Sequence, residues 1–126
     1  MLNSIPHTVA ALIAASIIVI GGFYIAAPHR VSGSFGLKPP ASDAETRAWL
    51  RLKGIRDIAS GLVVLTLMLT ADARTLGIVM LVLAIIPFGD MSNIITSGGR
   101  RVTAFSVHGV TCAVMLAVGL FLIRVI

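Results

Sequence analysis

The chain has 126 residues, of which 57% are hydrophobic and 12% are charged, and its mean hydropathy is +1.02. Soluble domains carry about 25% charged residues, so this composition excludes an ordinary soluble domain and predicts a single integral membrane domain over residues 1–126. The formal charge of +5 is accompanied by one Trp, one Tyr and five Phe. These aromatic residues are too few to stack nucleic-acid bases, so we expect no nucleic-acid partner and assign the cations to contacts with membrane lipid.

Four apolar segments follow one another along the chain. The first, Thr8–Ala27, is a run of 20 residues without a charge, which is long enough to cross a bilayer once. Short polar breaks separate the later segments, and short connections join helices that run antiparallel. The sequence therefore predicts an all-α, up-down-up-down four-helix bundle in the membrane. The predicted spans are residues 8–27, 44–70, 74–96 and 102–123.

Proline and glycine shape the connections between these segments. Three prolines and two glycines between residues 28 and 43 predict a loop without a regular element. Phe35 and Leu37 are apolar within this loop, and we expect them to anchor it at the membrane interface; the alternative is that the loop folds back as a lid. Pro87 is expected to kink the third span.

The second span carries charge where a membrane helix tolerates it least. Only 13 residues, Ile58–Thr70, separate Asp57 from the next break, and as a helix they rise about 20 Å against a hydrocarbon core of about 30 Å. Arg56 and Asp57 must therefore lie inside the membrane boundary, where an ionisable group usually faces a partner or a cavity. Lys53 and Asp57 are spaced as an i, i+4 pair. We expect Arg56 to neutralise Asp57 or Asp90.

Depth along the spans brings further polar residues to the same level. At a rise of 1.5 Å per residue, Asp90 and His108 fall in the same half of the bilayer as Asp57, whereas the opposite half is almost purely aliphatic. The sequence thus predicts a polar pocket open toward one side. Its predicted catalytic residues are Arg56, Asp57, Asp90 and His108, and its predicted substrate-binding residues are Tyr24, Phe35, Asn93 and Thr111.

Two carboxylates, an arginine and a histidine at one depth are the groups that acid–base catalysis requires. One interpretation is a membrane-embedded enzyme that opens an epoxide, isomerises or cyclises a lipophilic small molecule. Two alternatives stay open: buried charges that only fix helix packing, and a dimeric proton-coupled transporter. No cofactor is expected, and no metal site is expected because no paired histidine motif occurs.

The distribution of basic residues predicts an orientation. The side that carries the loop at 28–43 and the turn at 97–101 holds most of the Lys and Arg residues, which places it in the cytoplasm and both termini outside. We expect a bacterial-type inner membrane or another cell membrane. Small residues on one face of the first and fourth spans indicate association of two copies.

Several short motifs occur in a recognisable order: Pro28 with Arg30, Phe35–Gly36–Leu37, the block from Lys53 to Gly61, Asp90, and His108–Gly109. In this pattern the chain resembles a family of small four-span integral membrane proteins grouped as a domain of unknown function. The resemblance implies a four-span fold and a membrane location, and it implies no activity.

Overall fold

A computed structural model of the protein describes residues 4–124. The described residues form helices and no strand, which confirms the predicted all-α class. The helices are α1 (Ser4–Ala26), α2 (Pro28–Ser32), α3 (Ala44–Thr70), α4 (Ala73–Leu83), α5 (Ile85–Thr96), α6 (Arg101–Thr103), the π-helix η1 (Ala104–Gly109) and α7 (Val110–Leu122).

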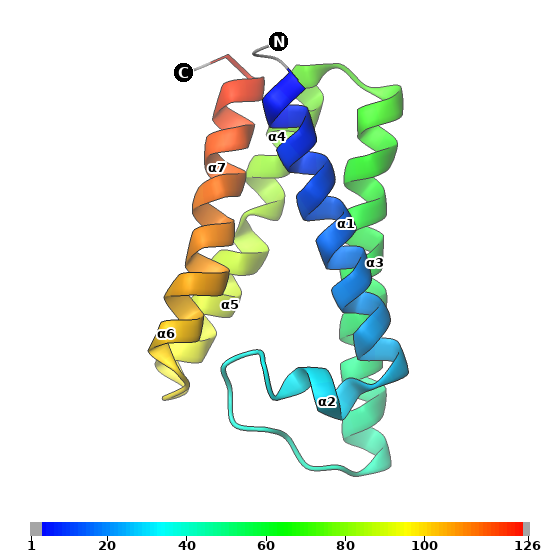
Figure 1. Cartoon of the computed structure of the whole chain (residues 1–126), viewed down its shortest axis with the longest axis vertical. Helices are drawn as coiled ribbons and strands as arrows, with labels where there is room; N and C mark the ends of the chain where they lie inside the picture. Colours follow the sequence, from blue (N-terminus) through cyan, green and yellow to red (C-terminus); the bar gives the residue numbers. More distant parts are fainter. Residues whose placement is uncertain (1–3, 125–126) are drawn as a thin grey trace.

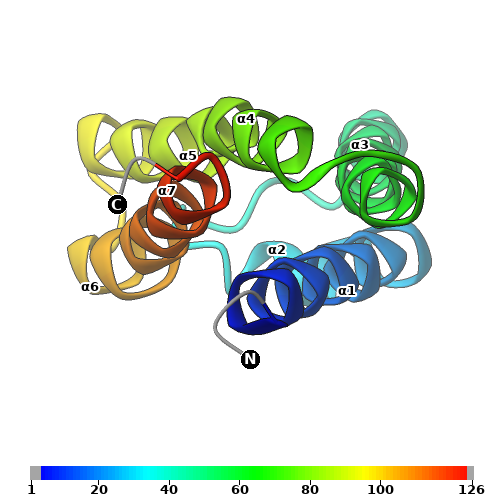
Figure 2. The same ribbon diagram turned by 90° about the horizontal axis from the view of Figure 1, so that it is seen from above.

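The long helices lie side by side in two pairs (Figures 1 and 2). One pair is α1 with α3; the other is the α4–α5 segment, which packs on α7 and η1. Within the described part of the chain, three helical segments are long and apolar enough to cross a membrane, namely Ser4–Ala26, Ala73–Thr96 and Arg101–Leu122. These three match three of the four predicted spans.

The hydrophobic core lies toward the end of the molecule where α1 begins and α7 ends. It is built from small and aliphatic side chains of both pairs, including Ala10, Ala14, Val64, Leu76, Met80 and Met115. Toward the other end the two pairs diverge, and α2 with the following loop occupies that end (Figure 1). We call this the loop end.

Acidic caps set the beginnings of two helices. Asp43 precedes α3 and accepts hydrogen bonds from the backbone N–H and the hydroxyl of Thr46, both at 2.8 Å. Asp72 precedes α4 and accepts one from the backbone N–H of Thr75 at 2.8 Å. These bonds favour the ionised carboxylates and hold the pKa of each Asp below its usual value. The short break between the second and third predicted spans thus consists of the end of α3 followed directly by the capped start of α4.

The segment from 28 to 43 is more regular than predicted. Pro28 ends α1 but also begins the short helix α2. Proline is well tolerated at the first position of a helix because the N–H that it lacks would have no partner there. The prediction of a loop without any regular element was therefore wrong for residues 28–32.

The second helix pair contains two backbone irregularities, one on each of its segments. Pro87 has no N–H to donate to the carbonyl of Leu83, and the helix is interrupted at Ala84, which confirms the predicted distortion of the third span. The Cys112 thiol of α7 donates to the Ala84 carbonyl at 3.5 Å. On the neighbouring segment, η1 widens the helix over Ala104–Gly109 and contacts α5.

Helices α1 and α3 approach closely at glycines. A Cβ atom added to Gly54 would lie 2.5 Å from the backbone oxygen of Gly21 and 2.9 Å from Cβ of Tyr24. Real Cβ atoms do not approach a backbone oxygen this closely, so any larger residue must push the helices apart. The contact brings Tyr24 onto the same turn of α3 as the charged residues.

We predict that Gly54→Ala destabilises the protein by about 1–3 kcal/mol, because the added methyl group meets backbone rather than a movable side chain. The matched control is Gly22→Ala, where an added Cβ atom finds no heavy atom within 4 Å. This control should be neutral or stabilising by about 0.5–1 kcal/mol, the usual preference for Ala over Gly inside a helix. Thermal unfolding in detergent measures both variants, and equal effects would contradict the close packing.

Candidate functional site

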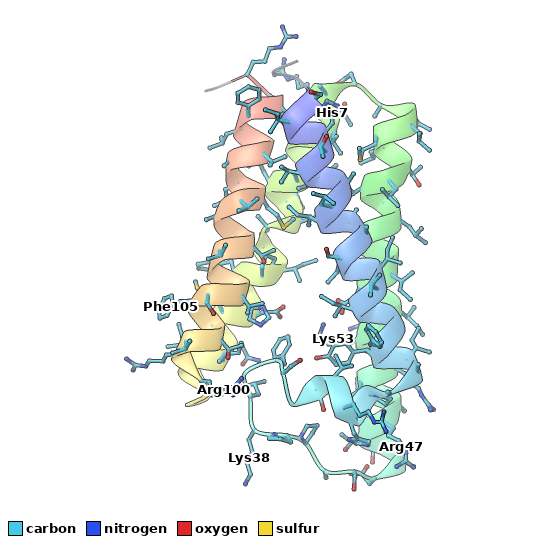
Figure 3. All side chains as sticks on the ribbon, viewed as in Figure 1. His7, Lys38, Arg47, Lys53, Arg100 and Phe105 are labelled. Carbon is cyan, nitrogen blue, oxygen red and sulfur yellow. The ribbon has the colours of Figure 1, made fainter. Side chains whose placement is uncertain are left out.

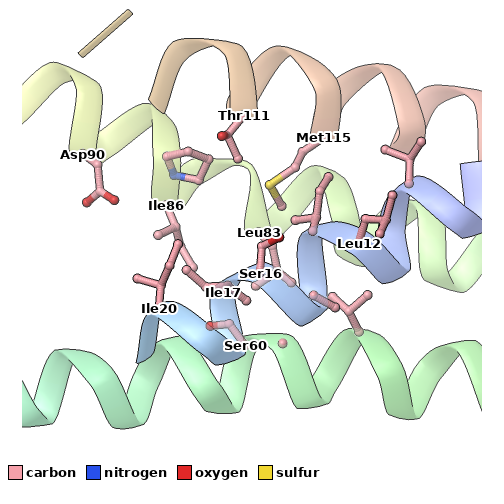
Figure 4. Close-up of a pocket in the computed structure, with 16 residues that line it drawn as sticks. Leu12, Ser16, Ile17, Ile20, Ser60, Leu83, Ile86, Asp90, Thr111 and Met115 are labelled. Carbon is pink, nitrogen blue, oxygen red and sulfur yellow. The ribbon is translucent and has the colours of Figure 1, made fainter. Parts of the chain in front are cut away.

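A cavity of about 320 Å³ lies between the two helix pairs. Its walls are mainly aliphatic side chains of α1, α4, α5 and α7, with Gly61 and Val64 from α3. Asp90 lies at one end of this cavity and is its only ionisable lining residue among those described, while Leu12 lies toward the other end (Figure 4). The hydroxyls of Ser60 and Thr111 donate to carbonyls of their own helices, at 2.9 and 2.7 Å. The carboxylate of Asp90 is therefore the charged group that the cavity offers to an occupant.

Asp57 is 7% exposed, and its charge is balanced by Lys53. Lys53 Nζ donates to Asp57 Oδ2 at 2.6 Å, one helical turn away on α3. A buried carboxylate without such a partner is strongly unfavourable, so the pair is what allows Asp57 to face the protein interior. The sequence spacing had indicated this pair, although Lys53 was not among the predicted site residues.

Two aromatic rings surround the ammonium group of Lys53. Its Nζ atom lies 4.5 Å from the ring centroid of Tyr24 and 5.3 Å from that of Phe35. Both distances are within the range of a cation–π interaction. Tyr24 comes from α1 and Phe35 from the loop, so Lys53 ties three separate parts of the chain together. Figure 3 shows Lys53 on the level of the loop.

Phe35 also contacts His108, which lies 73 residues further along the chain. The two rings are tilted by 59° with their centroids 4.7 Å apart, and His108 Nε2 lies 3.1 Å from the Phe35 carbonyl oxygen. A carbonyl oxygen only accepts hydrogen bonds, so Nε2 must carry a proton. The loop thus folds back onto the helices as a lid, the alternative that was not favoured from the sequence.

The other ring nitrogen of His108 faces Asp90. Nδ1 lies 3.6 Å from Asp90 Oδ2, and the two side chains are 12% and 30% exposed. Because Nε2 holds its proton, neutral His108 would present a lone pair at Nδ1 to a carboxylate oxygen, and two acceptors would repel. One proton held by either partner removes this repulsion. The Asp90 carboxylate and the His108 ring thus form a facing pair at the end of the cavity.

The π-helix accounts for the position of His108. The residue lies near the end of η1, where each turn contains an additional residue compared with an α-helix. The irregular turn is held against α5, which carries Asp90. Such π-segments occur frequently at functional sites. Phe35 contacts both Lys53 and His108, so the Lys53–Asp57 and His108–Asp90 pairs form one cluster.

A glycine in an unusual conformation positions the lid. Gly36 has φ +110°, a conformation that residues other than glycine rarely adopt, and it is buried against Thr103. Its carbonyl accepts a hydrogen bond of 2.8 Å from the backbone N–H of Arg100. The lid is thus fixed at the turn between α5 and α6, with Phe35 directed toward His108.

The structure separates the predicted site residues into two groups. It brings together Asp57, Tyr24, Phe35, His108 and Asp90, and Thr111 lines the adjoining cavity. Arg56 and Asn93 lie elsewhere.

Arg56 is exposed on the outer face of α3, and among the described residues it forms no ion pair. The predicted pairing of Arg56 with Asp57 or Asp90 was therefore wrong, because a helix that turns Asp57 inward points its neighbour about 100° away. Asn93 is also exposed, and its side-chain oxygen contacts Ser97 at 3.4 Å. Residues 4–124 contain no group of three His, Cys, Asp or Glu side chains suited to a metal ion.

We predict that Lys53→Met lowers the free energy of unfolding by about 1–3 kcal/mol, less than for a fully buried pair because the lysine side chain is 31% exposed. In the double variant with Asp57→Asn, part of this loss should be recovered, since no uncompensated carboxylate remains. Arg56→Met is the matched control on the same helix and should have little effect. Unfolding measured in detergent tests all three, and a loss for Arg56→Met equal to that for Lys53→Met would contradict the assignment.

A comparison with models of known protein families found a match. A family model described as a domain of unknown function (DUF4267) matches residues 14–122, which include every residue of the cluster around Lys53 and Asp90. No curated protein and no solved structure matches the chain. Because the family model covers most of the sequence, the chain belongs to the family of the domain of unknown function DUF4267.

Proposed function

We propose that the protein is a four-span membrane enzyme in which the Asp90–His108 pair transfers a proton to and from a lipophilic small molecule held in the adjoining cavity. The observation that carries this proposal is the position of Asp90, which both lines an apolar cavity of about 320 Å³ and faces Nδ1 of His108 at 3.6 Å. Small-molecule sites typically combine apolar walls with a few polar groups in this way.

The outer wall of the cavity supports a substrate that arrives from the bilayer. Leu12 and Ile86 line the cavity and are also 62% and 43% exposed, so the cavity reaches the surface that would face lipid. An apolar molecule could enter sideways between the helix pairs and place one reactive group beside Asp90. The proposal includes a membrane crossing by α3, whose Lys53–Asp57 pair would then be shielded from lipid by Tyr24 and Phe35.

The chemistry that best suits the pair is isomerisation by proton transfer. The Asp90 carboxylate would take a proton from the α carbon, between the carbonyl group and the C=C bond of a β,γ-unsaturated ketone, and leave a dienolate. Return of the same proton to the γ carbon would give the conjugated ketone without any co-reactant. Protonated His108 would stabilise ionised Asp90 before and after this exchange, with its orientation fixed by the Phe35 carbonyl.

The roles proposed for the remaining residues follow from their contacts. Asp57 is bound to Lys53 and does not line the cavity, which supports a positioning role for it rather than that of the catalytic acid. Transport is less well supported, because the core beyond the cavity is closed by apolar side chains such as Ala10, Leu76 and Met80. A carrier needs a polar path through both halves.

The proposal retains a cytoplasmic loop end and termini on the outer side, in a cell membrane, with two copies associated through small-residue faces. We predict that Ile5→Cys and Arg124→Cys react with a membrane-impermeant reagent from the same side, and that Lys38→Cys reacts only from the opposite side. The native Cys112 is buried and should add little background. Labelling of all three positions from one side would contradict the four-span arrangement.

The catalytic prediction uses purified protein in lipid nanodiscs with long-chain β,γ-unsaturated ketones. The conjugated isomer has the same mass as the substrate, so its formation is followed by ultraviolet absorbance, and Asp90→Asn should lower its rate of formation by at least about 10²-fold, the usual contribution of a general base. Asp72→Asn removes an exposed carboxylate remote from the cavity and serves as control. The enzyme proposal fails if a correctly folded wild type converts no substrate, or if Asp90→Asn retains full activity.

A further inference from the structure

A second recess, of about 480 Å³, lies at the loop end. It is separate from the cluster formed by the Lys53–Asp57 and Asp90–His108 pairs. It is bounded on one side by the loop after α2 and on the other by the turn between α5 and α6. Four glycines and two basic residues contribute to its lining: Gly33, Gly36, Gly98, Gly99, Lys38 and Arg100. No acidic residue is among the described residues that line it.

The two basic residues of this recess differ from Arg47 and Arg51, two other cations at the loop end. Arg47 donates to the Ser42 carbonyl at 2.8 Å, and Arg51 donates to the Ile25 carbonyl at 3.3 Å, so both are used to hold the chain together. Among the described residues, the side chains of Lys38 and Arg100 have neither a carboxylate partner nor a hydrogen-bond acceptor. Their charges are available to a ligand.

The position of the recess indicates where that ligand comes from. Lys38 and Arg100 both lie at the loop end (Figure 3). Lys38 lies in the loop after α2, and Arg100 lies in the turn between α5 and α6. In a membrane-embedded chain this is the level of the lipid headgroups. Cations at that level attract anionic lipid, and arginine in particular binds phosphate oxygens with two parallel hydrogen bonds. The recess, of about 480 Å³, is large enough to hold a phosphate group, and both residues contribute to its lining.

We propose that this recess binds a phosphate ester group, supplied by the headgroup of an anionic lipid, between Lys38 and Arg100. The proposal depends on the membrane location and is independent of the reaction at Asp90. A soluble phosphate ester would present the same chemistry, so the experiment below separates the two sources.

Occupation of the recess would act on the lid. Lys38 belongs to the lid loop and Arg100 to the facing turn, and the two segments are already joined by the hydrogen bond from Arg100 N–H to the Gly36 carbonyl. A phosphate group bound by both side chains adds a second connection across the same boundary. It therefore holds Phe35 over His108 and keeps the cluster covered from the loop end.

The test measures lipid retained by the purified protein in neutral detergent, where no charged membrane surface contributes. Native mass spectrometry with phosphatidylglycerol and phosphatidylcholine of identical acyl chains should show preferential retention of the anionic lipid. Lys38→Gln and Arg100→Gln should each reduce this retention by about fivefold, the effect of losing one basic contact of about 1 kcal/mol. Arg101→Gln removes the same charge from the adjacent, exposed position, which does not line the recess, and should have little effect.

Glycerol 1-phosphate added at millimolar concentration separates the sources. Failure to displace phosphatidylglycerol supports the lipid headgroup, whereas efficient displacement and tight binding on its own would assign the recess to a soluble phosphate ester and overturn the lipid source. Equal losses for Arg100→Gln and Arg101→Gln would show diffuse attraction and overturn the site itself. Thermal unfolding of each lipid-free variant confirms that the comparison is made between folded proteins.

Discussion

The carboxylate of Asp57 is the constraint on which the rest of the structure depends. A buried carboxylate must be neutralised within the protein, and Lys53 does so from one turn away. The long lysine side chain then needs cover of its own, which Tyr24 and Phe35 provide. Close packing of α1 on α3 at glycines brings Tyr24 near enough, and the folded-back loop supplies Phe35. One buried charge thus determines how α1, α3 and the loop are arranged.

The second helix pair meets this arrangement through its irregular backbone. The break before Pro87 and the π-helix around His108 lie on segments that contact each other, and each changes the direction of the side chains that follow. Asp90 comes after the break, and His108 lies within the π-helix. Regular helices would present the two residues at positions set by packing alone. The irregular backbone instead brings them to within 3.6 Å of each other, beside the cavity.

Much of the fold follows from simple features of the sequence. Apolar runs, polar breaks and prolines predicted the long helices to within a few residues, and the i, i+4 spacing indicated the Lys53–Asp57 pair. The outward direction of Arg56 was also contained in the helical period and was outweighed by the attraction of pairing adjacent opposite charges. Three of the described helical segments are long and apolar enough to cross a membrane. Helix α3 is not among them, because its charged residues lower its mean hydropathy.

The long-range part of the site was less accessible from sequence. The contact of Phe35 with His108 joins residues 73 positions apart and depends on a positive φ at Gly36, for which the local sequence offers only the glycine itself. The π-helix has no sequence signature comparable to a proline. Depth along the spans placed Asp57, Asp90 and His108 on one level, but depth alone does not say which side of each helix faces inward.

The apolar core and the charged cluster lie at opposite ends of this small protein. The apolar core joins the two helix pairs near the beginning of α1, where no charge has to be compensated. Toward the loop end the pairs diverge, and the contacts between them are made by a loop, a histidine and a cation rather than by close-packed side chains. Segments held by few apolar contacts open more readily than a packed core. The lid is therefore held by a small number of specific contacts, whereas the helix arrangement is held by the packed core.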